Sequence, residues 1–399
     1  MTLDYVLNWL ELFFRWFHVI AAIAWIGASF YVIWLDNSLE EPSEEKKAKG
    51  VKGDLWSIHG GGYYEVTKYR LAPPKQPDKL HWFKWEAYVT WLTGMVLMVL
   101  IYYVGAQSYL VDASKLALTT PQAIGLSVGS LILGLAVYEG LIRTPLRREN
   151  RIFGVVLFLL ITLYAWAMTS VFSGRGAYIQ VGVMIGTIMA GNVLLGIIPA
   201  QKVLVRAVEN GETPDPEPAL LAKLRSTHNN YFTLPIIFIM ISNHYPMTYG
   251  HELNWLVLAA LGGISAFTRH FFNLQHQGKT QVWILVVALF ALAALAFVMA
   301  PEQTTRSSAD TNGEAVSLIS EADLDHLVVE HCSACHAQSP SSSQFSSPPA
   351  GMVFESGEDM LRFRNPVIRS VESGYMPLGN PTGMTDEERQ QVVDWMQAQ

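Results

Sequence analysis

The composition of this 399-residue chain is that of a membrane protein. Hydrophobic residues make up 51% of the sequence and charged residues only 15%, which is too apolar for an ordinary soluble domain. The formal net charge is −7, and the basic and acidic residues are sorted into different regions, so the sequence gives no reason to expect nucleic-acid binding. Cys332 and Cys335 are the two cysteines, which excludes a disulfide framework beyond that pair.

Apolar segments predict an all-α fold, a polytopic helical bundle of about eight transmembrane helices. Each segment has the roughly 20 mainly apolar residues that a span requires. The first segment is longer than the apolar core of a signal peptide and lacks a basic start and a small-residue cleavage site, so we interpret it as a retained span. The predicted spans are 10–35, 83–104, 122–142, 152–173, 178–200, 229–246, 252–272 and 281–299.

The distribution of Lys and Arg predicts the orientation of these spans. Cytoplasmic loops are enriched in basic residues, so alternate loops should differ in their basic content. The loops with many basic residues are 46–79, 143–151, 202–225 and the one holding Lys279, whereas the alternate segments carry Lys115, Arg175 and Arg306. We therefore expect the N-terminus and the C-terminal part of the chain to lie outside the cytoplasm.

A second, smaller domain follows the last span. Residues 301–317 are polar and rich in Ser and Thr, which predicts a flexible linker. In residues 318–399, Ser320 with Asp323 and Thr385 with Glu388 form capping boxes that should open two helices. The domain prediction is a membrane domain at 1–300, a linker at 301–317 and a small domain at 318–399.

The small domain contains the stretch "CSACH", which predicts one covalent haem c. In Cys-x-x-Cys-His, Cys332 and Cys335 reach the two vinyl groups of a haem and His336 lies under the iron. This predicts a class I cytochrome c domain, and haem c is attached outside the cytoplasm, which agrees with the predicted orientation. The alternatives are a redox dithiol and half of a zinc site completed by His326 or His331.

A methionine just before the last helix is expected as the second iron ligand. The stretch "SGYMPLGNPTGMT" offers Met376 and Met384. The Met-Pro step favours Met376, because proline fixes the chain beside the ligand. Met384 immediately precedes a helix cap and is expected to pack in the core.

Histidines in the predicted spans are candidate ligands of one or two non-covalent haems b. His18 lies two turns inside the first span, where it needs a partner or a ligand, and we expect it to bind a haem together with His244 or His251. His228 and His244 are separated by about 24 Å along one span, and His251 and His270 by about 28 Å along the next. Because these spans are antiparallel neighbours, an outer pair and an inner pair would face each other. The alternative is that these four histidines lie at the membrane surfaces.

The first inner loop, "WSIHGGGYYEVTKY", is a candidate binding loop. Its three glycines, Gly60, Gly61 and Gly62, follow His59 and would let backbone amides approach a ligand. Tyr63 supplies a stacking surface, and Lys68 and Arg70 supply positive charge. The alternative is a flexible turn.

Taken together, these stretches resemble the bacterial membrane-bound, cytochrome c-linked urate oxidases. The resemblance is carried by "RWFHVIAAIAWIGASFYVIWLDNSL", "WSIHGGGYYEVTKY", "HWFKWEAYVTWLTG", and "CSACH" with "YMPLGNPTGMTDEER". It implies that urate is oxidised to 5-hydroxyisourate with oxygen from water. Electrons would pass through the fused cytochrome c to a respiratory acceptor without formation of hydrogen peroxide. The implied location is the bacterial inner membrane, with the cytochrome in the periplasm.

This resemblance gives the candidate residues their roles. We expect His59 or Glu86 as the catalytic base, Lys68, Arg70 or Arg269 as partners of the urate anion, and the amides of Gly60, Gly61 and Gly62 as partners of its carbonyl oxygens.

The face of the membrane that holds urate determines whether a relay is needed. Urate at the inner face would be separated from the cytochrome by about 30 Å of hydrocarbon, so haems in the membrane would have to carry the electrons. A site opening outward near His18 would need no relay and would make the glycine loop structural. The competing hypothesis is a cytochrome b/c module, such as a quinol dehydrogenase, without a purine site.

Overall fold

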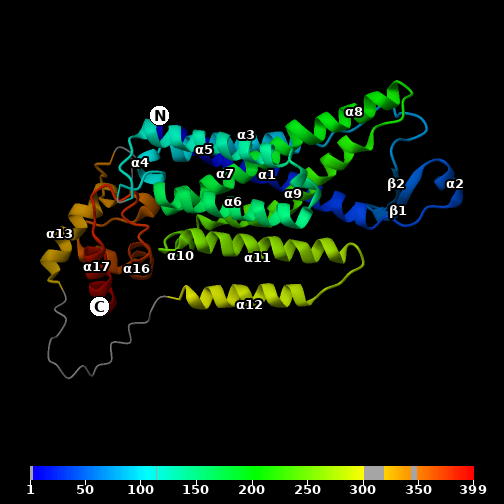
Figure 1. The fold of residues 1–399 in the computed structure, drawn as a ribbon. Coiled ribbons are helices and arrows are strands. Elements are labelled where there is room, and N and C mark those ends of the chain that lie inside the picture. The colour runs from blue at the N-terminus through cyan, green and yellow to red at the C-terminus, as the bar shows by residue number, and fades with distance from the viewer. Residues whose placement is uncertain (1–2, 114, 301–318, 343–347) are drawn as a thin grey trace.

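The computed structural model describes residues 3–113, 115–300, 319–342 and 348–399. It shows an elongated bundle of helices, with a small helical domain at one end and a β-hairpin at the other (Figure 1). The predicted linker at 301–317 lies outside the described residues.

The bundle is built from long helices that run back and forth between these two ends (Figure 1). Its long elements are α1 (Leu3–Asn37), α3 (Trp85–Leu97) with the π-helix η1 (Met98–Tyr103), α5 (Thr120–Leu141), α6 (Asn150–Val171), α7 (Gly174–Gly191) with η3 (Asn192–Ile197) and α8 (Ile198–Glu209), α9 (Pro216–Ser242), α11 (Asn254–Gln275) and α12 (Trp283–Val298). Short elements join them: α2 (Glu44–Ala48), α4 (Ala106–Tyr109), the 3₁₀ turn η2 (Pro145–Arg148) and α10 (Pro246–Tyr249).

Within the described ranges, 6 helical segments are long and apolar enough to cross a membrane. They make this chain a multi-pass membrane protein. The predicted spans at 229–246 and 281–299 are not among them: α9 carries Arg225, His228, Asn229 and Asn230 in its first half, and α12 has 16 residues. Both helices pack against α11, so the bundle includes them, and their crossing of the membrane stays a prediction.

Helix α7 forms the centre of the bundle. It contacts α3, α5, α6 and α9, and its buried residues include Tyr178, Val181, Ile185 and Ile188. Gly182 allows one of these contacts, because a Cβ at this position would lie 2.6 Å from Cγ2 of Ile239. By contrast, α1 and α12 expose large apolar side chains along their length, as expected for helices that face lipid.

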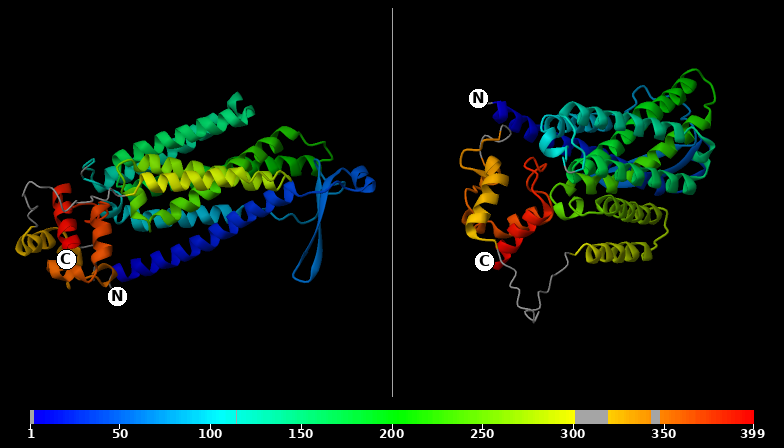
Figure 2. Two further views of the ribbon diagram at one scale, coloured as in Figure 1. Left: turned by 90° about the horizontal axis from the view of Figure 1, so that it is seen from below. Right: turned by 60° about the vertical axis from the view of Figure 1, so that its left-hand side comes forward.

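The loop predicted to be the first inner loop folds as a β-hairpin, which corrects the all-α prediction. Strands β1 (Val51–His59) and β2 (Gly62–Tyr69) pair antiparallel, with His59 opposite Gly62. Gly60 and Gly61 form the two-residue turn with φ of 57° and 82°, as a type I′ turn requires. The chain is therefore mostly helical, and the hairpin projects beyond the end of the bundle (Figure 2).

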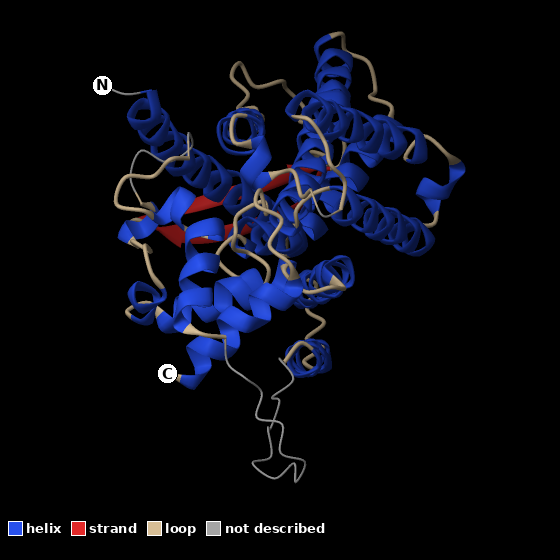
Figure 3. Cartoon of the chain, turned by 90° about the vertical axis from the view of Figure 1, so that its left-hand side faces the viewer, coloured by secondary structure: helices blue, strands red, loops and turns tan. Residues whose placement is uncertain are grey.

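The C-terminal domain is a set of short helices around its own core (Figure 3). Its elements are α13 (Glu321–His331), α14 (Ser333–His336), η4 (Pro349–Gly351), α15 (Gly357–Leu361), α16 (Arg364–Glu372) and α17 (Asp386–Ala398). The predicted capping box at Thr385 is confirmed, and its Oγ1 accepts from the Glu388 N–H at 3.2 Å. Ser320 caps its helix through Oγ, which accepts from the Asp323 N–H at 3.1 Å and donates to the Asp323 carboxylate at 2.6 Å. The first and last helices of the domain, α13 and α17, contact each other.

Candidate functional site

Polar residues gather inside the bundle at the end nearer the hairpin, and one group of them is linked by an ion pair and hydrogen bonds. Arg225 on α9 binds Glu139 on α5 through two hydrogen bonds of 2.5 and 2.9 Å. The same guanidinium donates to Asn192 at 2.9 Å, and the amide of Asn192 donates to Asn229 at 2.8 Å. Because the charges and most donors in this group have partners, we interpret it as a structural network that joins α5, η3 and α9.

Arg269 on α11 belongs to a second buried group that is not paired in this way. Its side chain is 3% exposed, its Nε donates to Oδ1 of Asn230 at 3.1 Å, and its guanidinium lies 3.8 Å from the ring centroid of Phe30 on α1. Its Nη2 is buried without a hydrogen-bond partner. In the described part of the chain, no carboxylate forms an ion pair with this guanidinium.

The neighbours of Arg269 also have unused hydrogen-bonding atoms. Asn273 and His276 follow Arg269 by four and seven residues, so they share its face of α11 and of the turn that ends the helix. Oδ1 of Asn273, Nδ1 of His276 and Nδ2 of Asn230 are each buried without a partner. Glu86, at the start of α3 and at the same end of the bundle, has one buried unpartnered carboxylate oxygen, Oε2.

The hairpin residues predicted to bind urate lie in two places. His59, Gly60, Gly61 and Tyr63 are at the exposed tip, where a Cβ on either glycine would meet nothing within 4 Å. Gly62 pairs with His59 in the strand, and Arg70 is exposed at the end of β2.

The base of the hairpin, by contrast, reaches the bundle. Lys68 on β2 forms an ion pair with Asp36 near the end of α1, and Lys223 on α9 lies 3.2 Å from the same carboxylate. The structure therefore places Lys68 at the end of the bundle, whereas the glycine turn is exposed.

Of the three histidines predicted near the outer face, His18 and His251 have partners close by in the structure. Nδ1 of His18 donates to the carbonyl of Thr90 at 3.0 Å and lies 3.0 Å from Oγ1 of Thr93. His251 accepts from the N–H of Leu253 at 3.0 Å, and His244 is exposed. Among the contacts of the described residues, none joins His18 to His244 or His251.

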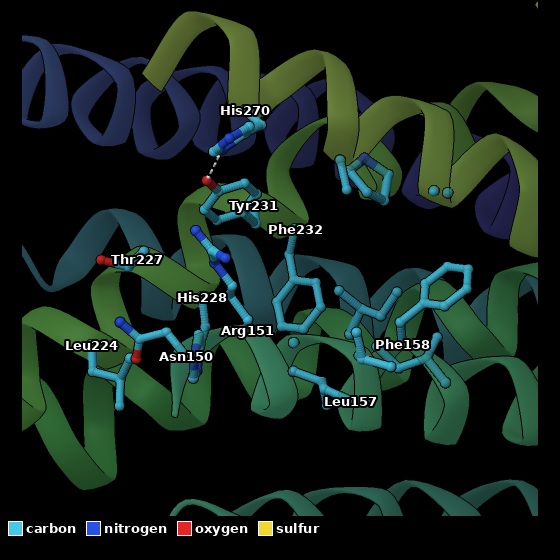
Figure 4. A pocket seen from close by; sticks show the side chains of 18 of the residues that line it. Asn150, Arg151, Leu157, Phe158, Leu224, Thr227, His228, Tyr231, Phe232 and His270 are labelled. Carbon is cyan, nitrogen blue, oxygen red and sulfur yellow. Dashed lines mark hydrogen bonds between the residues drawn. The ribbon is translucent and has the colours of Figure 1, made fainter. Parts of the chain in front are cut away.

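The inner histidines line one cavity of about 1330 Å³ between α6, α9 and α11. His270 forms a 2.6 Å hydrogen bond with Tyr231 (Figure 4). His228 forms a 2.8 Å hydrogen bond with Tyr138. The walls are mainly apolar, with Phe158 and Phe232 among them, and basic residues lie at the hairpin end. The predicted inner pair is thus brought to the same cavity, although each histidine binds a tyrosine.

At the opposite end of the bundle, the C-terminal domain docks through a contact that the sequence analysis missed. Arg175 on α7 donates to the hydroxyl of Tyr375 at 3.0 Å, and also to Tyr102 at 3.3 Å and Asn243 at 3.2 Å. The ring of Tyr249 packs edge-on against Tyr375 with centroids 6.0 Å apart. In the sequence, Arg175 was only one of few basic residues predicted outside, and nothing local marks its partners.

The C-terminal domain and the bundle are packed closely together. Gly379, with φ of 72°, packs so tightly that a Cβ would lie 2.5 Å from the carbonyl oxygen of Gln107. A cavity of about 900 Å³ lies at this junction, lined by Arg175 and Tyr375 among other residues. The segment that contains Met376 is therefore held directly against the bundle.

The C-terminal domain presents a geometry that fits haem c. Cys332 and Cys335 are free thiols, and buried His336 donates from Nδ1 to the carbonyl of Met352 at 2.9 Å. This bond fixes the tautomer and leaves Nε2 free for a metal. Burial lowers the pKa of His336, which favours the neutral form that a ligand needs.

Other residues of the domain are consistent with the same assignment. Met376 packs against the edge of the domain core, whereas Met384 is 4% exposed within that core. In the described ranges there is no group of three or more His, Cys, Asp or Glu side chains arranged to hold a metal ion, so a zinc site at Cys332 and Cys335 has no further ligands there.

The fold and these sites define a multi-pass membrane protein with unpaired polar groups inside its helical bundle and a separate C-terminal domain. The family model for the urate oxidase N-terminal domain matches residues 4–300, so the chain belongs to that family. The match covers the whole bundle and ends before the C-terminal domain. No curated protein and no solved structure matches the chain.

Proposed function

We propose that this protein is a membrane-bound urate oxidoreductase that passes electrons to a haem c in its own C-terminal domain. The observation that carries the proposal is the family match over residues 4–300, which gives the bundle a urate-related oxidoreductase role. The Cys-x-x-Cys-His geometry of the C-terminal domain supports the choice of electron acceptor.

The proposed reaction converts urate to 5-hydroxyisourate. One water molecule supplies the new oxygen, and the urate anion loses two electrons and the water loses one proton. No dioxygen is consumed, so no hydrogen peroxide is formed. Glu86, with its buried unpartnered oxygen, is the better placed of the two predicted bases, because His59 lies at the exposed hairpin tip. Lys68 and Arg70 at the hairpin remain proposed attracting charges for the substrate anion.

When bound, haem c would supply a one-electron acceptor whose potential the axial ligands set. Cys332 and Cys335 would hold it covalently, and His336 would present Nε2 because Nδ1 is occupied by Met352. We propose Met376 as the second axial ligand. A respiratory acceptor or terminal oxidase would then take the electrons on the periplasmic side of the bacterial inner membrane.

The position of the unpaired polar groups bears on the electron path. Arg269 follows Asn254, at the outer end of α11, by fifteen residues, or about 22 Å. One tunnelling step over such a distance would be slow, so urate at this end favours one or two haems b between the two sites. We retain His18, His244, His251, His228 and His270 as proposed ligands; His18 already has the Nδ1 hydrogen bond typical of a metal-bound histidine.

The cavity between α6, α9 and α11 favours one second candidate, a quinol dehydrogenase. Its apolar walls and the two histidine–tyrosine pairs would suit a quinol head group and its isoprenoid tail.

Substrate-driven reduction of the haem separates these candidates. Membranes containing the protein are oxidised, made anaerobic and mixed with either urate or a soluble quinol analogue. Urate alone should give the reduced spectrum of haem c, with two electrons delivered per urate consumed. Reduction by the quinol analogue but not by urate would overturn the proposal and support the second candidate.

A further inference from the structure

Among the described residues of the bundle, no carboxylate pairs with the buried guanidinium of Arg269. A buried guanidinium normally has a carboxylate partner, as Arg225 has in Glu139, because removing both charges from water is otherwise too costly. Arg269 has the amide oxygen of Asn230 and the face of Phe30, and both of these partners are uncharged. An anion is therefore the missing partner.

The unpaired atoms around Arg269 restrict the chemistry of that anion. Nη2 of Arg269 and Nδ2 of Asn230 are donors, whereas Oδ1 of Asn273 is an acceptor. A ligand that satisfies all three must carry acceptor oxygens and at least one N–H or O–H donor. The phosphodiester of a lipid has no hydrogen to donate to Asn273, and inorganic phosphate offers its O–H groups from a tetrahedral centre rather than along a planar edge. An oxopurine anion has carbonyl oxygens and ring N–H groups along its edge, in one plane.

We propose that Arg269, Asn230 and Asn273 form the urate site of this protein, with His276 at its edge. This inference rests on the proposed function and adds the location of the substrate. Arg269 and Asn273 lie one helical turn apart on α11, and Asn230 joins them from α9. Phe30 lies against the guanidinium and fixes its orientation.

The same end of the bundle offers an entrance of matching charge. Asp36 follows Phe30 on α1 by six residues, about 9 Å along the helix, and it is paired with both Lys68 and Lys223. These lysines would draw an anion toward this end. Urate therefore enters from the hairpin side, opposite the C-terminal domain.

The test compares urate binding and stability in full-length protein and its variants. The protein is reduced beforehand so that bound urate is not consumed, and affinity is measured by equilibrium dialysis with labelled urate. Arg269→Gln and Asn273→Leu should each weaken binding roughly 10- to 100-fold, because each loses a hydrogen bond to a charged ligand. Arg206→Gln, which removes an exposed positive charge from α8, is the control and should bind as the wild type does.

Thermal stability without urate separates a binding role from a structural one. Since Arg269 is uncompensated, Arg269→Gln should unfold at the same temperature as the wild type or higher, and added urate should stabilise the wild type only. Lower stability of this variant, or its failure to fold, would show a structural arginine and overturn the inference.

Further outcomes distinguish the site from the function. If the wild type oxidises urate and both site variants keep its affinity, the site is wrong and the proposed function stands. If inorganic phosphate displaces urate at equal concentration, the site does not recognise the purine ring and the inference is wrong. If the wild type neither binds nor oxidises urate, the proposed function fails first.

Discussion

The hydroxyl of Tyr375 should control how firmly the C-terminal domain is held against the bundle. It accepts a hydrogen bond of 3.0 Å from the guanidinium of Arg175, which connects residues 200 positions apart. The substitution Tyr375→Phe removes this acceptor and keeps the ring contact with Tyr249. Its effect therefore isolates one charge-assisted hydrogen bond.

The expected magnitude follows from the partners that remain. A hydrogen bond to a charged group contributes about 1.5–3 kcal/mol. Arg175 keeps its bonds to Tyr102 and Asn243 in the variant, so we expect the lower end of this range. The ratio of docked to undocked domain should then fall by roughly tenfold.

Amide hydrogen exchange measures this ratio directly. Full-length protein in lipid discs is compared with Tyr375→Phe for the exchange rate of the peptide 373–380, which should rise by that factor. Tyr245→Phe, a half-exposed tyrosine at the same end, is the control. A double-mutant cycle with Arg175→Leu should show non-additive effects. Unchanged exchange in Tyr375→Phe, or strict additivity in the cycle, would refute this account of the docking.

Three further predictions concern the hairpin and the C-terminal domain. Gly60→Asn should preserve the turn and urate turnover, since Asn-Gly suits a type I′ turn, whereas Gly60→Val should destabilise the hairpin by about 1 kcal/mol because valine is strained at positive φ. A loss of urate affinity in Gly60→Asn would instead indicate that the turn binds urate. Met376→Ala should lower the midpoint potential of haem c in a redox titration, whereas Met384→Ala should leave this potential unchanged and destabilise the domain by about 2–5 kcal/mol. The reverse pattern would show that Met384 is the iron ligand and Met376 the packing residue. Hydrogen bonds from the N–H groups of Glu355 and Ser356 lower the pKa of the Asp359 carboxyl, so this carboxylate stabilises the domain above the pKa of an unfolded aspartate and the stabilisation is lost as the pH falls through the folded pKa. Asp359→Asn should flatten this part of the curve of stability against pH, and an unaltered curve would contradict the assignment.

Features that depend on neighbouring residues could be predicted from the sequence. The helix caps at Ser320 and Thr385 are examples, because each is completed within one helical turn. Most of the membrane helices are another, since a span is recognised from one continuous apolar segment. Two predicted spans are not among these helices, because α9 is polar over its first half and α12 is short.

The hairpin was missed although it is local. Strands are usually recognised by alternation of apolar and polar residues, but both faces of Val51–Tyr69 carry exposed polar or aromatic side chains. The glycines therefore indicated a loop, and the positive φ of Gly60 and Gly61 became visible only with the paired strands on either side.

The sequence by itself determined that this is a membrane protein with a Cys-x-x-Cys-His segment in a separate C-terminal part, because composition and spacing are properties of contiguous residues. The tertiary structure decided which polar residues are paired. Arg225 and Arg269 are both buried basic residues of the bundle, yet one pairs with Glu139 from α5 and the other packs against Phe30 from α1. That difference comes from contacts between distant segments, and the proposed urate site at Arg269 rests on it.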